Sequence, residues 1–159
     1  MEINIETSVY AQKAMGLFKE GFNCSQSVFL AFEDLHKIDR KTALKLSSSF
    51  GGGMGRLREV CGAVSGMFMA AGILYGYDDP KDYEAKKEHY ERIQLLAKEF
   101  ESCNGSIVCR QLLGLGEGKD APAPEKRSEE YYKKRPCAEL VGMAAAILEQ
   151  YISINSQIE

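Results

Sequence analysis

Four of the five cysteines in this chain stand where the sequence predicts that a helix begins: Cys24, Cys61, Cys109 and Cys137. The first turn of a helix carries partial positive charge and unpaired backbone N–H groups, and both stabilise a thiolate relative to a thiol. The thiolate is the form of cysteine that attacks disulfides and binds metals. A fold that brings these helix starts together would therefore hold a redox site or a metal site.

Two of these helix starts have a recognisable cap. Asn23, with a glutamine three residues later, gives the pattern of a capping box, so Cys24 is expected as the first helical residue. Ser106 is expected to cap the segment 107–113, which would place Cys109 in its first turn. Both sulfurs would then lie close to unpaired backbone N–H groups.

The other two starts depend on different signals. Pro136 is expected as the first residue of the last helix, because proline suits that position, and Cys137 follows it. Cys61 comes after the glycine-rich run 51–55 and has no obvious cap, but we expect it within the first two turns of an apolar helix. Cys103 closes a long helix, where the helix dipole disfavours an anion, so we leave it outside the site.

The elements that would position these cysteines form a row of helices. Apolar residues recur at helical spacing, and strand signals are nearly absent. The segments expected to be helical are 6–20, 24–36, 39–47, 60–75, 80–102, 107–113 and 136–153. The stretch 114–128 has no apolar period and is predicted to be a connecting loop rather than a mobile lid. The predicted fold is an all-α, single-domain bundle of about six to eight helices over residues 1–159.

The longest of these segments, 80–102, is predicted to begin at Pro80 and to carry one apolar seam. One side of this helix should therefore be buried and the other exposed. The seam consists of Tyr83, Tyr90, Ile93, Ala97 and Phe100.

A short internal similarity links two of the cysteine helices. Residues 61–70 read CGAVSGMFMA and residues 137–146 read CAELVGMAAA. In both segments small residues recur every four positions, which lets helix backbones approach closely. We therefore expect these two helices to pack on each other at their N-terminal halves and to make Cys61 and Cys137 neighbours.

Composition and charge exclude several classes of protein. The net charge is −3 and the isoelectric point is about 5.5, so we expect neither a surface for nucleic acid nor a polybasic membrane anchor. The N-terminus lacks a basic region followed by an apolar run, so we expect no signal peptide and a reducing, cytoplasmic location. The uncharged segment 60–77 contains four glycines and is interpreted as a buried helix rather than a membrane span.

The chain resembles the bacterial C_GCAxxG_C_C family, which is named after its cysteine pattern. Four segments carry the resemblance in the expected order: FNCSQSVF at 22–29, GGGMGRLREVCGAVSG at 51–66, CRQLLG at 109–114 and RPCAELV at 135–141. In the second segment Gly62 stands between the cysteine and the alanine, a form that the family also uses. The resemblance implies redox activity, with cluster or metal binding as its alternative, and it assigns this chemistry to Cys24, Cys61, Cys109 and Cys137.

Three functions are open from the residues. In the first, a cytoplasmic redox-active or redox-sensing protein uses thiol–disulfide or peroxide-type chemistry, with Cys61 and Cys137 as the favoured couple. Cys24 and Cys109 would then act as resolving thiols or relay electrons to this couple. The redox partner of the protein is left open. No CxxC motif exists, so any pair must come from different helices.

Arginines near these cysteines in the sequence would lower the pKa of the thiols. They are Arg58, Arg110 and Arg135.

In the second function, the same four cysteines hold a metal ion or an iron–sulfur cluster. Their number allows this, although zinc ribbons and ferredoxins use more closely spaced pairs. In the third, the protein is a helical binding or scaffold module whose cysteines are packing residues. Tyr83 and Phe100 would then lie on a homo-oligomer face. Thiol reactivity and elemental analysis distinguish the three functions.

Overall fold

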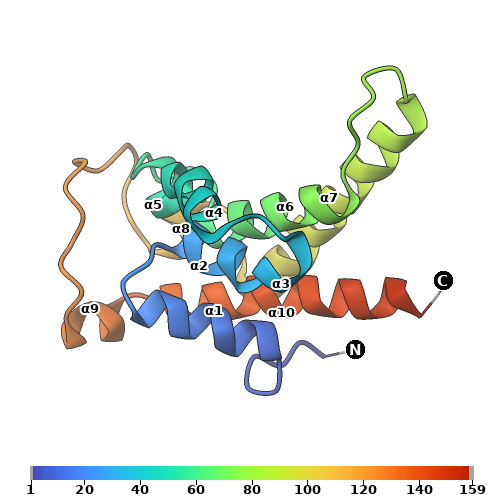
Figure 1. The fold of residues 1–159 in the computed structure, drawn as a ribbon. Helices are drawn as coiled ribbons and strands as arrows, with labels where there is room; N and C mark the ends of the chain where they lie inside the picture. Colours follow the sequence, from blue (N-terminus) through green and yellow to red (C-terminus); the bar gives the residue numbers. More distant parts are fainter. Residues whose placement is uncertain (1, 158–159) are drawn as a thin grey trace.

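Helix α10 (Cys137–Ser156) is the element on which the other long helices pack. The computed structural model describes residues 2–157. In it α10 contacts α1 (Val9–Lys19), α2 (Cys24–Ala31), α6 (Gly62–Tyr75) and α7 (Tyr83–Asn104). In Figure 1 α10 crosses the lower part of the molecule with α2 and α6 above it, and the N-terminal ends of these three helices point to the same side.

Shorter helices and turns connect these elements. They are α3 (Glu33–His36), α4 (Arg40–Ser47), the 3₁₀ turn η1 (Ser48–Phe50), α5 (Gly51–Met54), α8 (Cys109–Leu112) and α9 (Glu129–Lys134). Within residues 2–157 no β-strand forms, and one isolated bridge joins Val60 to Val108. The prediction of an all-α single-domain bundle is confirmed, with six helices of eight or more residues in the described part of the chain.

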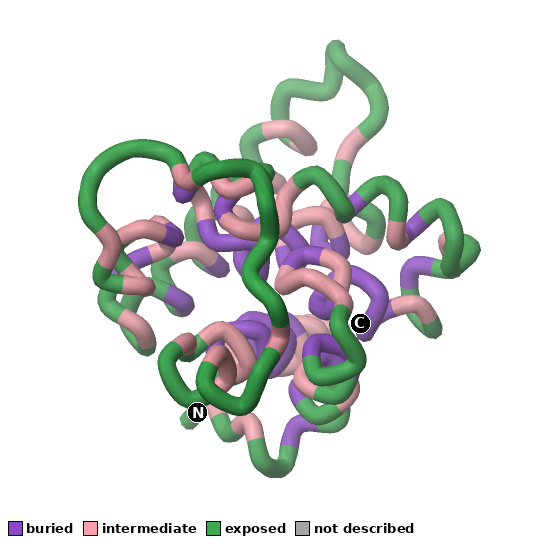
Figure 2. Tube along the Cα trace, turned by 90° about the vertical axis from the view of Figure 1, so that its left-hand side faces the viewer, coloured by how far each residue is buried: buried purple, intermediate pink, exposed green. Residues whose placement is uncertain are grey.

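The core consists of apolar side chains from α1, α2, α6, α7 and α10. The large side chains with almost no exposure include Phe18, Phe29, Phe32, Phe100 and Leu148. Burying a side chain of this size contributes about 1.5–3 kcal/mol, so this cluster is the main source of stability. Figure 2 shows the buried residues gathered in the middle of the fold, with exposed connecting segments around them.

The apolar character of α10 follows from its central position. Its residues from Leu140 to Leu148 are buried apart from Met143. Among the described residues, α10 is the one helix long and apolar enough to cross a membrane, and 44% of that stretch is buried inside the protein. The uncharged segment 60–77 forms the 14-residue α6, most of which lies in the core, in agreement with its interpretation as a buried helix.

The two similar segments do not pack on each other through their small residues. A Cβ at Gly66 of α6 would lie 2.7 Å from the main-chain oxygen of Ser25, so this face of α6 receives α2. A Cβ at Gly142 of α10 would lie 2.5 Å from Met15 Sδ, so the matching face of α10 receives α1. The predicted packing is therefore wrong in its detail. Helices α6 and α10 do contact each other, but each uses its small residues to admit a different neighbour.

Helix α7 begins later and is less buried than the sequence predicts. Its N-cap is Asp82, and Pro80 lies in the turn before it. Tyr83 is 70% exposed and Tyr90 is 54% exposed, whereas Phe100 is fully buried. In Figure 1 the connection after α6 and the start of α7 project from the body of the molecule, so only the second half of the predicted seam reaches the core. A homo-oligomer face that includes Phe100 is excluded by this burial.

Candidate functional site

The four predicted cysteines line one small cavity, here called the inner cavity. Helices α2, α8 and α10 each begin with one of these cysteines, and Cys61 is the N-cap of α6. The volume of the cavity is about 20 Å³, somewhat above the roughly 10–15 Å³ that one water molecule needs. Its lining residues are Cys24, Arg58, Cys61, Gly62, Cys109, Leu112, Leu113, Cys137 and Leu140. Cys103 is exposed on α7 and does not line it.

Cys24 and Cys137 are each the first residue of a helix. The predicted capping box at α2 is present, because the Gln26 N–H donates to Asn23 Oδ1 at 2.9 Å and the Asn23 N–H donates to Gln26 Oε1 at 3.1 Å. At α10 the N-cap is Pro136, so this helix begins one residue later than predicted. Both cysteines are half-buried.

A short main-chain pairing joins the two segments that carry the other two cysteines. The Cys61 N–H donates to the oxygen of Ile107 at 2.8 Å, and the Cys109 N–H donates to the oxygen of Glu59 at 2.6 Å. These bonds flank the isolated bridge between the two segments and fix the start of α6 next to α8. The helix predicted around Cys109 is reduced to four residues, and Ser106 does not cap it.

The chain between η1 and α6 contains a run of residues with left-handed backbone. The φ angle lies between 60 and 69° at Gly52, Gly53, Met54, Gly55, Arg56 and Arg58. A residue with a side chain costs about 1–3 kcal/mol in this region, so the surrounding packing must hold the segment in place. Gly53 is also required by space, since a Cβ there would lie 2.6 Å from Cys109 Cβ. The glycine run is therefore a tight turn that directs Arg58 toward the cysteines.

Arg58 is a buried cation next to the inner cavity. Its Nη1 donates to Cys109 Sγ at 3.6 Å, and its Nε and Nη2 reach Asp120 Oδ2 at 2.9 and 2.8 Å. Burial lowers the pKa of Arg58, but its contacts with Cys109 and Asp120 outweigh burial and the net pKa is raised. The hydrogen bond from Arg58 lowers the pKa of Asp120. Arg110, the other arginine near this cysteine in the sequence, contacts Glu59 at 3.5 Å instead.

Burial, rather than the helix ends, determines the state of three of these thiols. Burial raises the pKa of Cys24 and of Cys61, and backbone N–H groups oppose the shift only in part. Burial also raises the pKa of Cys137 to about 12, with the charges of neighbouring cysteines adding to it and two arginines opposing it. The backbone N–H groups at the helix starts therefore lower the pKa of Cys24 and Cys61 as expected, but burial has the larger effect and the net pKa of all three thiols is raised.

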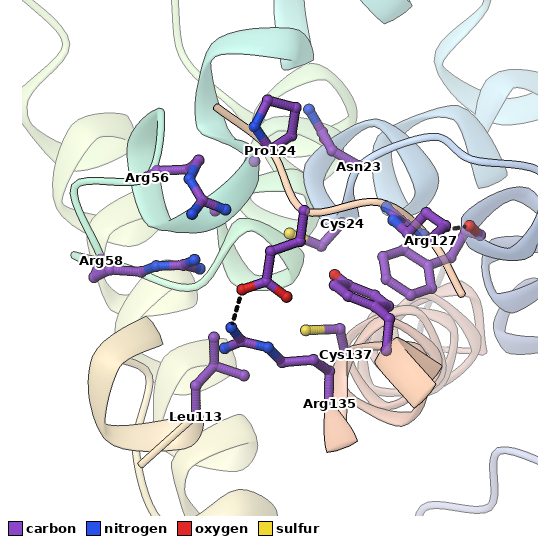
Figure 3. A pocket seen from close by; sticks show the side chains of 14 residues that line it. Asn23, Cys24, Arg56, Arg58, Leu113, Pro124, Arg127, Arg135 and Cys137 are labelled. Atoms are coloured by element: carbon purple, nitrogen blue, oxygen red, sulfur yellow. Dashed lines mark hydrogen bonds and ion pairs between the residues drawn. The ribbon is translucent and has the colours of Figure 1, made fainter. Parts of the chain in front are cut away.

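A larger space, here called the outer pocket, adjoins the inner cavity (Figure 3). It measures about 190 Å³ and is lined by Cys24 and Cys137 but not by Cys61 or Cys109, which are only 5% and 6% exposed. Figure 3 shows the sulfur atoms of Cys24 and Cys137 at this pocket, surrounded by guanidinium groups. The arginines are Arg56, Arg58, Arg127 and Arg135. The cysteines thus form an outer pair, Cys24 and Cys137, and an inner pair, Cys61 and Cys109.

The loop 114–128, predicted to be a plain connector, forms one wall of the outer pocket. Asp120 attaches it to Arg58, and Glu125 accepts a hydrogen bond from Arg135 at 2.6 Å. Arg127 donates to the main-chain oxygens at the end of α1 and in the turn after it, at 2.9 and 3.0 Å. No local signal predicts this role, because the loop has no apolar period and its contact with Arg58 joins residues far apart in the chain.

All five cysteines are free thiols in this structure. In the part of the chain described, no group of three or more Cys, His, Asp and Glu side chains is arranged to hold a metal ion. The number of converging cysteines does match the four-thiolate ligand sets of structural zinc and iron–sulfur sites. A metal would therefore require these side chains to turn toward a common centre.

A family model described as "Putative redox-active protein (C_GCAxxG_C_C)" matches residues 22–151 of the chain. The matched range includes all four cysteines of the inner cavity and the whole of the loop 114–128. Comparison with curated proteins and with solved structures found no match. The description of the family agrees with the gathering of thiols in the structure.

Proposed function

This chain belongs to the C_GCAxxG_C_C family, described as putative redox-active proteins, and on that premise we propose that it is a thiol–disulfide redox protein. The observation that carries the proposal is the inner cavity, where four cysteines from four helix ends meet. Cysteines that only fill space do not require a buried arginine next to a sulfur, since burying a charge is costly. Arg58 is buried nonetheless, and it donates to Cys109 Sγ.

The outer pair meets the substrate in this proposal, because only Cys24 and Cys137 line the outer pocket. Cys24 is the nucleophile, since backbone N–H groups of Gly52 and Ser25 act on its sulfur and favour the anion. Its thiolate attacks a disulfide R–S–S–R, forms a mixed disulfide and releases RS⁻. The Cys137 thiolate then attacks Cys24 Sγ and releases the second RS⁻. The two thiol protons pass to the two leaving groups, so the substrate is reduced to two RSH and the outer pair is oxidised.

The inner pair supplies a second dithiol in the same proposal. The charge of Cys109 contributes to the raised pKa of Cys137, which is consistent with the closeness that exchange requires. A Cys109 thiolate attacks Cys137 Sγ in the outer disulfide and frees Cys24, and Cys61 then attacks Cys109 Sγ and frees Cys137. The couple of Cys61 and Cys137 expected from the sequence stays a prediction, and the outer pocket favours Cys24 as the first partner of Cys137.

Access of water controls the rate in this scheme. The raised pKa of Cys24 and of Cys137 has burial as its largest cause, and a thiol must lose its proton before it attacks. Hydrating the outer pocket weakens the effect of burial and leaves the helix ends and the arginines to stabilise the thiolates. Free thiols with this role suit a reducing compartment, and we place the protein in the cytoplasm on that ground.

The test is a redox titration of the purified, fully reduced protein under anaerobic conditions. The protein is equilibrated with reduced and oxidised glutathione at increasing potential, free thiols are alkylated, and their number is measured by mass spectrometry. We expect thiols to be lost in pairs and to return on reduction. Cys137→Ser should stop at a glutathione adduct on Cys24, because the second attack by Cys109 is directed at the sulfur of Cys137. Five unmodified thiols at every potential would contradict the proposal and favour a binding or scaffold module.

A metal or iron–sulfur cluster held by the same cysteines is a second candidate function, favoured by the same convergence of four sulfurs. Elemental analysis and an absorption spectrum of the anaerobically purified protein distinguish it from the first. One stoichiometric equivalent of zinc or iron that protects all four cysteines from alkylation would support it. The absence of any bound element, with pairwise loss of thiols, would support thiol–disulfide exchange.

A further inference from the structure

Positive charge is concentrated on the wall of the outer pocket. Four guanidinium groups line it, whereas the carboxylates that pair with them are Asp120 and Glu125. Arg56 and Arg58 both contact Asp120, and Arg135 contacts Glu125. The pocket therefore has an excess of positive charge next to the two outer sulfurs.

Arg127 is the cation whose hydrogen bonds go to uncharged groups. Its Nη1 and Nη2 donate to the main-chain oxygens of Phe18 and Phe22, and its guanidinium lies 4.0 Å from the centre of the Phe18 ring. These contacts fix the side chain at the pocket without neutralising it. A fixed, partly buried guanidinium of this kind is well suited to hydrogen bonding with a carboxylate, because Arg presents its donors in a planar fork.

Glu125 already places one carboxylate in this pocket. Its Oε1 accepts a hydrogen bond from Arg135 at 2.6 Å, which is the dashed line that begins at Arg135 in Figure 3. The side chain of Glu125 is 45% exposed, compared with 16% for Arg135, so the carboxylate lies at the open side and the cation lies deeper. Another carboxylate can replace it on Arg135 with the same kind of hydrogen bond.

The size of the pocket limits the ligand to a small molecule. Its volume of about 190 Å³ is below the range of about 300–1,000 Å³ typical of sites for drug-sized ligands. We propose that the outer pocket binds a small disulfide bearing carboxylates, with an acidic group on Arg127 and Arg135 and a sulfur next to Cys24. Glu125 holds the place of that acidic group until the substrate arrives. This inference rests on the proposed thiol–disulfide function and names its class of substrate.

The reaction is the exchange already described, with R bearing a carboxylate. Cys24 and Cys137 lose two protons and two electrons and become a disulfide, and the substrate becomes two acidic thiols. The arginines take no part in electron transfer. They bind the acidic group, and they stabilise negative charge on the outer sulfurs once Glu125 has moved away, since Arg135 and Arg127 already lower the pKa of Cys137.

The experiment compares three disulfides of similar length that differ in charge. They are 3,3′-dithiodipropionate, 2-hydroxyethyl disulfide and cystamine, which are anionic, neutral and cationic at neutral pH. Oxidation of the reduced protein by each is followed under anaerobic conditions by thiol alkylation and mass spectrometry. We expect the rate to fall in that order, and added salt to reduce the difference between the anionic and the neutral compound.

Glu125→Gln and Glu117→Gln form a matched pair of variants on the same loop. Glu125→Gln removes the competing carboxylate and should raise the rate with dithiodipropionate about 5-fold, the effect of one unit charge at about 4 Å screened as in water. Its rate with 2-hydroxyethyl disulfide should rise less, because the loss of the Glu125 charge then acts only through the outer sulfurs and not on the binding of a carboxylate. Glu117 is exposed and does not line the pocket, so Glu117→Gln should match the parent protein with all three compounds.

Octanedioate, which has the length of dithiodipropionate but no sulfur, separates binding from redox chemistry. It should inhibit oxidation by dithiodipropionate competitively, and more strongly in Glu125→Gln. Equal rates for the three disulfides without inhibition by octanedioate would overturn the inference and leave the thiol–disulfide function standing. If none of the three disulfides oxidises the protein, the proposed function fails, and the substrate assignment fails with it.

Discussion

Replacing Gly62 by alanine tests whether the closeness of α2 and α6 forms the cysteine site. Gly62 is the first residue of α6 and lines the inner cavity. A Cβ at this position would lie 2.5 Å from Cys24 Sγ, 2.9 Å from the main-chain oxygen of Phe50 and 3.2 Å from the Ser25 nitrogen. The sulfur can rotate away, but the two main-chain atoms cannot. The backbone of η1 or of α6 must therefore move.

The expected change in the free energy of unfolding of Gly62→Ala follows from two opposing effects. Forcing an extra methyl group into packed structure costs about 1–3 kcal/mol, whereas glycine to alanine within a helix gains up to about 1 kcal/mol. Gly62→Ala should therefore lower the free energy of unfolding by about 1–2 kcal/mol. Gly72 lies in the interior of the same helix with no atom within 4 Å of its added Cβ. Gly72→Ala should raise the free energy of unfolding by about 0.5–1 kcal/mol.

The assay is urea unfolding of both variants and the parent, combined with the rate of alkylation at each cysteine measured by mass spectrometry. The sulfur of Cys24 should move toward the outer pocket in Gly62→Ala, so its alkylation should become faster while that of Cys137 changes little. Gly72→Ala should leave both rates as they are. If Gly62→Ala is as stable as Gly72→Ala, with the reactivity of Cys24 unchanged, the close contact between α2 and α6 does not shape the site.

Two further predictions concern individual thiols. Since the folded state raises the pKa of Cys137 from 9.0 to about 12, stability should be full below pH 9 and should fall as the pH rises from 9 toward 12. Between pH 8 and pH 10 this thiol should lower the free energy of unfolding by about 1.4 kcal/mol. The fall in unfolding free energy over this range should therefore be smaller by about that amount in Cys137→Ala. An unchanged fall in this variant would refute the raised pKa of Cys137. Cys103→Ser should leave the redox titration unaltered because Cys103 is exposed on α7 away from the cavity, and loss of reversible oxidation in this variant would contradict the division of the cysteines.

Much of the site could be predicted because its signals are local. The capping box of Asn23 and Gln26 fixes the start of α2 regardless of the rest of the fold, and the structure contains both of its hydrogen bonds. The N-terminal position of Cys137 likewise follows from the proline before it, whereas Cys109 begins α8 without the predicted cap. Cys61 is the N-cap of α6 rather than part of its first turns, and its position depends on the pairing with the segment before α8, which is a tertiary contact.

The state of the thiols could not be predicted, because it depends on burial. A sequence shows that a helix end favours a thiolate, but the water removed from the sulfur is set by packing against other helices. In Cys137 the arginines oppose the raised pKa, as their sequence positions indicate, yet burial has the larger effect. The prediction that the whole apolar seam of α7 is buried is wrong for a similar reason. Tyr83 and Tyr90 have the correct spacing, but they lie in the part of α7 that projects from the body of the molecule, and both remain exposed.

Helix ends and burial act on these sulfurs in opposite directions, and the loop 114–128 forms one wall of the pocket in which this balance is set. With Asp120 on Arg58 and Glu125 on Arg135, the loop covers the outer pocket and supplies the carboxylates that occupy its arginines. Moving Glu125 away from Arg135 would leave this cation unpaired beside Cys137, which favours the thiolate of Cys137. The ion pairs that hold the loop in place are therefore the same pairs that occupy the cations beside the sulfurs.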